Sequence, residues 1–157
     1  MTMLRPPRFI RSLKKSPLIL EALLQPVTQE QAQSAYDADW NVVAVVCHLR
    51  DFEAIFFRRC RMMLEQPDPL LPAYDHAQMA HDGNYNNQNL REVLSEFRQT
   101  RAEYVTWLEE LPEADWQRTG THPEVGPVTI MEVALQVALH DVDHIEQIAQ
   151  MLHGDLR

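Results

Sequence analysis

Apolar side chains recur at steps of three and four residues over four long stretches of the chain, residues 8–24, 40–65, 89–111 and 130–152. That spacing places the apolar positions on one face of an α-helix and leaves the other positions for solvent. Four such helices can bury their apolar faces by packing against one another. The pattern therefore predicts an all-α protein built as a four-helix bundle, and no stretch alternates regularly enough to predict a β-strand.

The ends of these stretches carry helix-start signals. Thr28 and Thr129 each have a glutamine or glutamate three residues later, which is the pattern of a capping box. Pro17 lies inside the first stretch, so the first helix either contains it or begins near Ser16 with proline in its first turn. Residues 70–88 and 118–127 form two long connections. We expect them to cross the bundle or border a pocket, and not to link a simple up-and-down arrangement.

Three histidines occupy positions where the helical pattern calls for apolar residues. His140 and His144 are four residues apart in the last predicted helix, so they lie one turn apart on the same face. His48 lies on the apolar face of the second predicted helix. If these faces pack together, three imidazoles meet inside the bundle, where an unpaired polar group costs roughly 1–3 kcal/mol. Either each ring is a core histidine satisfied by hydrogen bonds, or the three bind a metal ion, which imidazoles do well.

Composition limits the possible partners. The 157 residues include 45% hydrophobic and 24% charged side chains and carry a formal net charge of −9. They fit one domain, residues 1–157, with a core from about residue 16 to residue 153. The negative charge argues against a nucleic-acid partner, and the apolar runs are too short to span a membrane, so we expect a cytoplasmic protein. Cys47 and Cys60 lie about 20 Å apart along one predicted helix, too far for a disulfide.

Three segments resemble the DinB/YfiT-like superfamily of metalloenzymes. They are WNVVAVVCHLRDFE at residues 40–53, HPEVGPVT at residues 122–129, and HDVDHIEQI at residues 140–148. The resemblance extends over residues 16–152. The ordered set, with one histidine early and a His-x-x-x-His pair in the last helix, carries the match.

The resemblance implies a fold, a metal and a partner. It implies a DinB-like four-helix bundle with long crossover connections that holds a divalent ion, usually nickel, zinc or iron. Carried over position by position, the ligands are His48, His140 and His144. Members of the superfamily often form homodimers, and some are thiol-dependent transferases or isomerases that act with a low-molecular-weight thiol.

Three nitrogen ligands leave at least one coordination position open, as catalytic sites do. We therefore expect a metal-dependent enzyme that activates a thiol or water against a small electrophilic molecule, either a thiol S-transferase or a hydrolase. The alternatives are a non-catalytic, metal-binding dimer with a stress-response role and a bundle without metal. Asp51 and Asp141 are candidates to orient the ligand histidines. Four side chains are candidates for the pocket, with packing and loop anchoring as their alternative roles: Trp40, Tyr74, Tyr85 and His122.

Overall fold

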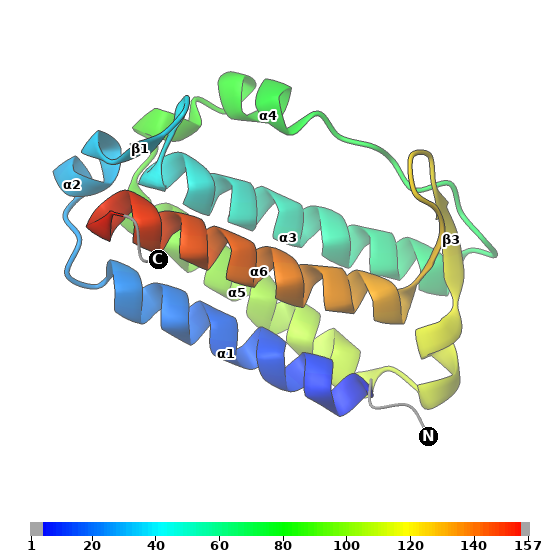
Figure 1. Ribbon diagram of the computed structural model, residues 1–157. Coiled ribbons are helices and arrows are strands. Elements are labelled where there is room, and N and C mark those ends of the chain that lie inside the picture. The colour runs from blue at the N-terminus through cyan, green and yellow to red at the C-terminus, as the bar shows by residue number, and fades with distance from the viewer. Residues whose placement is uncertain (1–4, 155–157) are drawn as a thin grey trace.

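The computed structural model describes residues 5–154 and arranges four long helices in one bundle (Figure 1). These helices are α1 (Pro6–Leu24), α3 (Val42–Glu65), α5 (Leu90–Glu110) and α6 (Ile130–His153). Each buries the apolar stripe seen in the sequence. The predicted all-α four-helix bundle is confirmed, while residues 1–4 and 155–157 of the predicted domain lie outside the described residues. No helix within residues 5–154 is both long and apolar enough to cross a bilayer.

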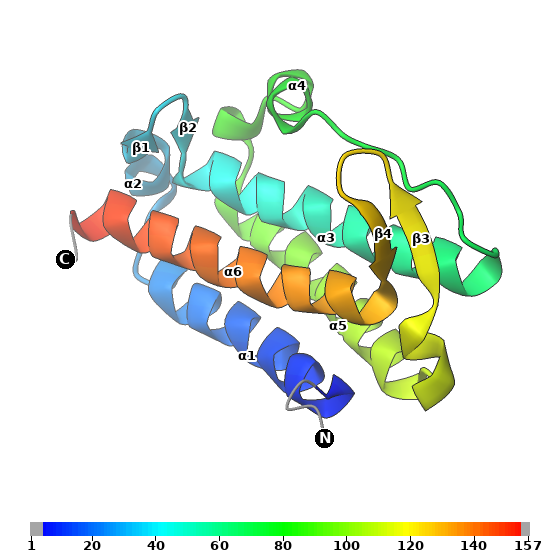
Figure 2. The same ribbon diagram turned by 45° about the vertical axis from the view of Figure 1, so that its right-hand side comes forward.

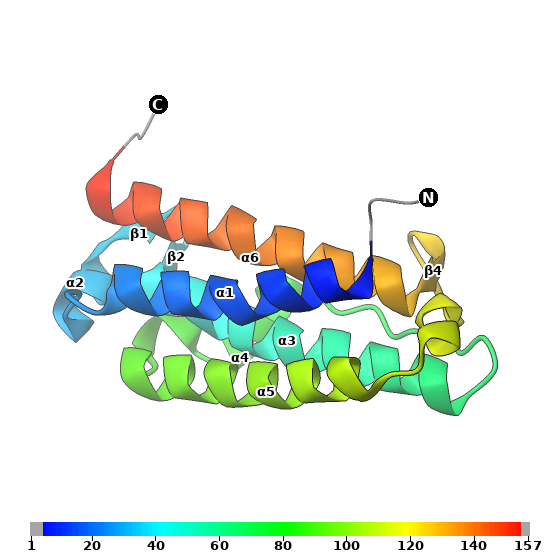
Figure 3. The same ribbon diagram turned by 90° about the horizontal axis from the view of Figure 1, so that it is seen from below.

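The long connection between α3 and α5 sets the topology. α3 and α5 run in the same direction, as do α1 and α6 (Figures 1 and 3). The core agrees, since one apolar cluster joins the first halves of α3 and α5 and a second cluster joins their second halves. The chain returns along the bundle through a crossover that contains α4 (His76–Asp82) and the short 3-10 helix η1 (Tyr85–Asn87). The first of the two expected connections is therefore a true crossover.

Side-chain caps mark the starts of α2, α3, α5 and α6. Thr28 caps α2 (Gln29–Ser34) and Thr129 caps α6, each through the predicted capping box. Asn41 accepts from the Ala44 backbone N–H at the start of α3, and Asn89 caps α5 in the same way. Each cap satisfies backbone donors that the first turn of a helix leaves unpaired.

The prediction that the chain has no strands was wrong at two places. The pair β1 (Tyr36–Asp37) and β2 (Trp40–Asn41) precedes α3, so α3 begins at Val42 and not at residue 40. The pair β3 (Thr119–His122) and β4 (Gly126–Thr129) follows the 3-10 helix η2 (Glu113–Gln117) and occupies the second long connection. The two hairpins lie at opposite ends of the bundle (Figure 2). These strands are two to four residues long, too short for alternation to show.

The first helix contains Pro17 rather than beginning beside it. Proline has no backbone N–H, so it leaves the carbonyl of Leu13 without its usual donor one turn later. Arg101 of α5 supplies that donor, because its Nη1 lies 3.1 Å from the Leu13 oxygen. A long-range contact thus compensates for a local defect in α1.

Arg101 is the centre of a buried ionic cluster that ties the four helices together. It is 2% exposed and donates to both carboxylate oxygens of Glu53 on α3, at 2.6 and 2.7 Å. It also donates to both oxygens of Asp141 on α6, at 2.7 and 2.9 Å. Ser16 of α1 donates its hydroxyl to Asp141. Burying these charges is tolerable only because each is paired and hydrogen-bonded.

Candidate metal centre

The structure brings the three predicted histidines together between α3 and α6. His48 Nε2 lies 2.9 Å from His140 Nε2, and His144 Nε2 lies 3.2 Å from the same atom. All three nitrogens fall within 4.8 Å of one another. The i, i+4 spacing on α6 places two rings one turn apart, and α3 presents the third ring from across the groove.

The amide of Gln147 determines which nitrogen of His144 carries hydrogen. Gln147 Nε2 donates to Asp37 Oδ2 over 2.7 Å, and a carboxylate can only accept. The Oε1 atom of the same amide lies 2.8 Å from His144 Nδ1 and therefore accepts its hydrogen. In neutral His144 the Nε2 atom then carries only a lone pair, available to a Lewis acid.

Burial keeps two of the rings neutral. It lowers the pKa of His48 from 6.5 to about 2, and repulsion from His144 and His140 adds to the effect. Burial also lowers the pKa of His140 to about 4, again with repulsion from His144. The apolar rings of Trp40 and Phe52 lie against His48, with centroids 5.2 and 4.4 Å away. Rings that resist protonation keep the lone pairs that bind a metal.

Two of the three nitrogen–nitrogen distances fit ligands of one divalent metal ion. Two nitrogens bound tetrahedrally at about 2.0–2.1 Å from zinc lie about 3.3 Å apart. The observed contacts of 2.9 and 3.2 Å are close to that value. Ligand histidines usually donate their second N–H to a carboxylate, a carbonyl or water. His48 departs from this arrangement, because its Nδ1 is buried and has no hydrogen-bond partner among residues 5–154.

The three rings open into a cavity of about 480 Å³. The turn between β1 and β2, the start of α4 and the facing sides of α3 and α6 enclose it. A second cavity of about 610 Å³ adjoins it and continues along the groove to the β3–β4 hairpin. Phe52, His76 and His140 line both cavities, so the two cavities are direct neighbours beside the histidines.

The two carboxylates predicted to orient the ligands have other partners. Asp51 accepts from the Tyr85 hydroxyl and, at 2.7 Å, from Arg50 Nε. Asp141 belongs to the Arg101 cluster. Neither carboxylate hydrogen-bonds a ring of the three histidines within the described part of the chain. Asp141 directly follows His140, so it projects from another side of α6, into the core. Asp51 lies one turn after His48 on α3, but Tyr85 and Arg50 hold its carboxylate.

The four predicted pocket residues divide between the cavities and the core. Trp40 lines the cavity beside the histidines, and Tyr74 and His122 line the adjoining one. Tyr85 is buried instead, with its ring 6.4 Å from Trp40 and its hydroxyl on Asp51.

Sequence reasoning did not assign functional roles to several other residues in the groove. Phe52 and Phe56 follow His48 along the same face of α3, which the apolar pattern includes without marking a cavity. Arg59 interrupts that face with a charge, and this interruption was a signal that could have been used. Gln147 lies one turn after His144, but only the position of Asp37 reveals its role.

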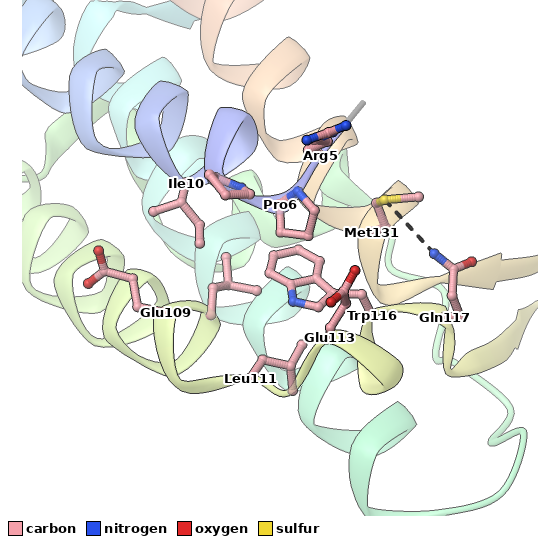
Figure 4. Close-up of a pocket in the computed structure, with 11 residues that line it drawn as sticks. Arg5, Pro6, Ile10, Glu109, Leu111, Glu113, Trp116, Gln117 and Met131 are labelled. Carbon is pink, nitrogen blue, oxygen red and sulfur yellow. Dashed lines mark hydrogen bonds between the residues drawn. The ribbon is translucent and has the colours of Figure 1, made fainter. Parts of the chain in front are cut away.

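A larger cavity, of about 810 Å³, lies elsewhere and has no histidine in its lining. Proline, isoleucine and leucine side chains surround the ring of Trp116 where α1, α5 and α6 meet near η2 (Figure 4). Its charged members, Arg5, Glu109 and Glu113, stand at its edges and no histidine lines it. The histidine groove is therefore the candidate functional site despite its smaller volume.

The fold and the histidine cluster together define a four-helix bundle with a potential metal site between two of its helices. Residues 12–148 match the sequence pattern of the DinB superfamily. The chain therefore belongs to the DinB superfamily, as the three sequence segments implied.

Individual relatives are similar to the chain over most of its length. A protein of Oceanobacillus iheyensis named "Putative metal-dependent hydrolase" is 24% identical over 144 residues, which cover 91% of this chain and 83% of that protein. A Geobacillus thermodenitrificans protein with the same name is 26% identical over 111 residues, which cover 70% of this chain and 62% of the relative.

A solved structure shares the fold. YfiT from Bacillus subtilis superimposes with a TM-score of 0.84 over 99% of this chain and 91% of its own, at 19% sequence identity. It is described as "a probable metal-dependent hydrolase with an unusual four-helix bundle topology". Because the superposition extends over nearly the whole chain, it includes the parallel pairing of α3 with α5 and the long crossover.

Proposed function

We propose that the protein is a metal-dependent hydrolase in which His48, His140 and His144 bind one divalent ion, nickel, zinc or iron. The observation that carries the proposal is the convergence of three Nε2 atoms at ligand spacing, two of them on rings that burial keeps neutral. The names of the relatives support the same class of reaction. Such an ion, with a position left open by three protein ligands, supplies a bound water whose pKa is lowered to about 7.

The chain's own residues would prepare the site for hydrolysis. Gln147 and Asp37 hold His144 in one tautomer, so its Nε2 needs no rearrangement to bind. Trp40 and Phe52 shield one side of the cluster from water. His76 stands at the cavity wall with its ring 6.1 Å from that of His48, where it can accept a proton from the attacking water.

A thiol-dependent transfer reaction is a second candidate. The cavity beside the histidines adjoins a larger one, so a low-molecular-weight thiol and an electrophile could occupy the two spaces together. The open metal position would hold the thiol as its thiolate, the reactive form. The two proposals share the same ligands and differ in the nucleophile, so one set of assays can separate them.

The test compares metal-free and metal-reconstituted protein on small activated esters and amides, with and without glutathione-type thiols. We expect hydrolysis that depends on the metal and does not require a thiol. His140→Ala should abolish this activity. His153→Ala is the matched control, because this exposed residue lies on the same helix outside the cavities. Turnover that requires a thiol would favour the transferase. Metal binding without either activity would favour the non-catalytic alternative, a metal-binding dimer with a stress-response role.

We also propose that the protein is cytoplasmic and forms a homodimer. Four large apolar side chains are exposed on the neighbouring helices α1 and α6: Leu18, Ile19, Leu139 and Val142. Monomeric proteins rarely expose a large apolar patch, and a second copy of the chain could cover these side chains. Light scattering should then give twice the chain mass, and Val142→Glu should halve it. A monomeric wild-type protein would reject this part of the proposal.

A further inference from the structure

A buried arginine lies in the groove without an acidic partner. Arg59 follows His48 by eleven residues on α3, about 16 Å along the helix axis, and is 8% exposed. It lines the second cavity. No salt bridge joins it to a carboxylate within residues 5–154, unlike Arg101 in the core. A buried cation usually has a counter-ion, so Arg59 is exceptional in this chain.

Its guanidinium is held in place but only partly satisfied. Nη2 donates to the Pro72 carbonyl over 2.6 Å and lies 3.2 Å from His122 Nε2. Nε is buried without a partner, and Nη1 makes no hydrogen bond with the described residues. The rings of Phe56 and Tyr74 lie 6.0 and 5.7 Å from its Cζ atom. The fork is therefore fixed in position with donors to spare.

His122 cannot fully satisfy Arg59, because a second donor also faces its ring. The backbone N–H of Glu124 points to His122 Nδ1 over 3.3 Å, while Arg59 donates toward Nε2 of the same ring. An imidazole always carries at least one N–H, so both nitrogens cannot accept at once. An oxygen acceptor of the right charge would relieve this excess of donors, as in charge-assisted arginine pairs.

We propose that Arg59 and His122 form a subsite for the carboxylate end of an apolar small-molecule substrate. The proposal rests on the proposed function for its reaction but not for its binding. Glu124 and Glu132 also line the cavity, so one guanidinium among acidic neighbours suits a single negative charge better than a phosphate dianion. The rest of the wall is largely apolar, with Phe52, Leu71 and Val128 among its members.

The subsite and the histidines are placed to hold two ends of one molecule. The ring of Phe56 stands between them, with its centroid 5.5 Å from the His140 ring and 6.0 Å from the Arg59 Cζ atom. A substrate lying along Phe52 and Phe56 would present its reacting carbonyl to the histidines while Arg59 holds the remote carboxylate. Such a remote charged contact would fix the orientation of the substrate at the reacting end.

The test measures binding of three ligands of one chain length, namely hexanoate, hexanamide and hexyl phosphate. NMR titration of isotope-labelled, metal-free protein follows the Arg59 Nε–H and His122 ring signals. We expect hexanoate to bind about ten times more tightly than hexanamide. Arg59→Gln should remove that preference. Arg58→Gln, which changes the exposed neighbour on the same helix, should keep it.

Several results would overturn the subsite. These are equal binding of the acid and the amide, no binding of either, or unchanged preference in folded Arg59→Gln. Tighter binding of hexyl phosphate would replace the carboxylate with a phosphate. If Arg59→Gln does not fold, Arg59→Lys replaces it, since lysine keeps the charge but lacks the two-pronged guanidinium. The comparison of hexanoate with hexanamide on the wild-type chain tests the subsite in either case. Zinc uptake measured on the same protein reports the metal proposal separately, since hexanoate binding needs no metal.

Discussion

Replacing Arg101 with methionine tests the ionic cluster that fastens the four helices. The substitution keeps much of the side-chain volume and removes the charge that both Glu53 and Asp141 share. It also removes the donor that satisfies the Leu13 carbonyl, which Pro17 leaves open. Two carboxylates and one carbonyl would then be buried without their partner.

The expected cost is large because the partner groups stay buried. Breaking a buried ion pair by removing one side costs about 3–5 kcal/mol. Small domains are stable by about 5–15 kcal/mol, so the variant should fold but unfold much more readily. Arg98→Met is the matched control on the same helix. Its ion pair with Glu21 is 48% and 41% exposed, and such pairs contribute at most about 1 kcal/mol.

The pH dependence of the stability of Arg101→Met gives a second, independent test. Burial raises the pKa of Glu53 above 4.5 even beside Arg101, and the loss of that cation raises it further. A raised carboxyl pKa means that stability is present at low pH and is lost as pH rises. The difference in free energy of unfolding between the wild type and Arg101→Met should therefore be smaller at pH 5 than at pH 7.

Urea unfolding of metal-free protein, followed by circular dichroism at both pH values, measures these quantities. The reasoning is refuted if Arg101→Met costs no more than Arg98→Met. It is also refuted if the gap between Arg101→Met and the wild type is the same at pH 7 and pH 5.

Three further predictions concern the histidines, a helix cap and the thiols. The pKa values of His48 and His140 are lowered below 6.5, so between pH 7 and pH 5 the unfolded chain binds protons at these rings and the folded chain does not. The free energy of unfolding of the metal-free wild type should therefore fall by about 2 kcal/mol per ring from pH 7 to pH 5. A free energy of unfolding that stays constant over this range in urea titrations would contradict this prediction. Thr129→Ala removes the α6 cap and should lower the free energy of unfolding by about 1 kcal/mol in the same assay, whereas no change would mean that the cap is replaced by water. Burial raises the pKa of the Cys47 and Cys60 thiols to about 12, so a disulfide reagent should react only on unfolding, and rapid labelling of native protein would disprove their burial.

Local patterns were enough to predict the four helices and the positions of the histidines. The stripe on α6 placed His140 and His144 on one face, and periodicity placed His48 on the apolar face of α3. The capping boxes marked the starts of α2 and α6 because their hydrogen bonds join residues only three apart. These features depend on neighbours within one helical turn, which a single sequence displays directly.

Features that depend on distant contacts could not be predicted in this way. The stretch from residue 6 folds as one helix through Pro17 because Arg101, far along the chain, satisfies the carbonyl that proline leaves open. Asp141 follows a candidate ligand in sequence, but its carboxylate pairs with Arg101 instead of a histidine. The role of Gln147 depends on Asp37, which reaches it from the β1–β2 hairpin. Each outcome was decided by packing between elements.

X-ray absorption spectroscopy of the zinc-loaded protein tests the central claim most directly. The account predicts one ion per chain with three imidazole nitrogens at about 2.0–2.1 Å and one oxygen ligand, from water, in the open position. His48→Ala should lose one of the three imidazoles, and His81→Ala, an exposed residue of α4, should lose none. An ion bound without imidazole nitrogens, or a coordination shell that His48→Ala leaves unchanged, would contradict the account.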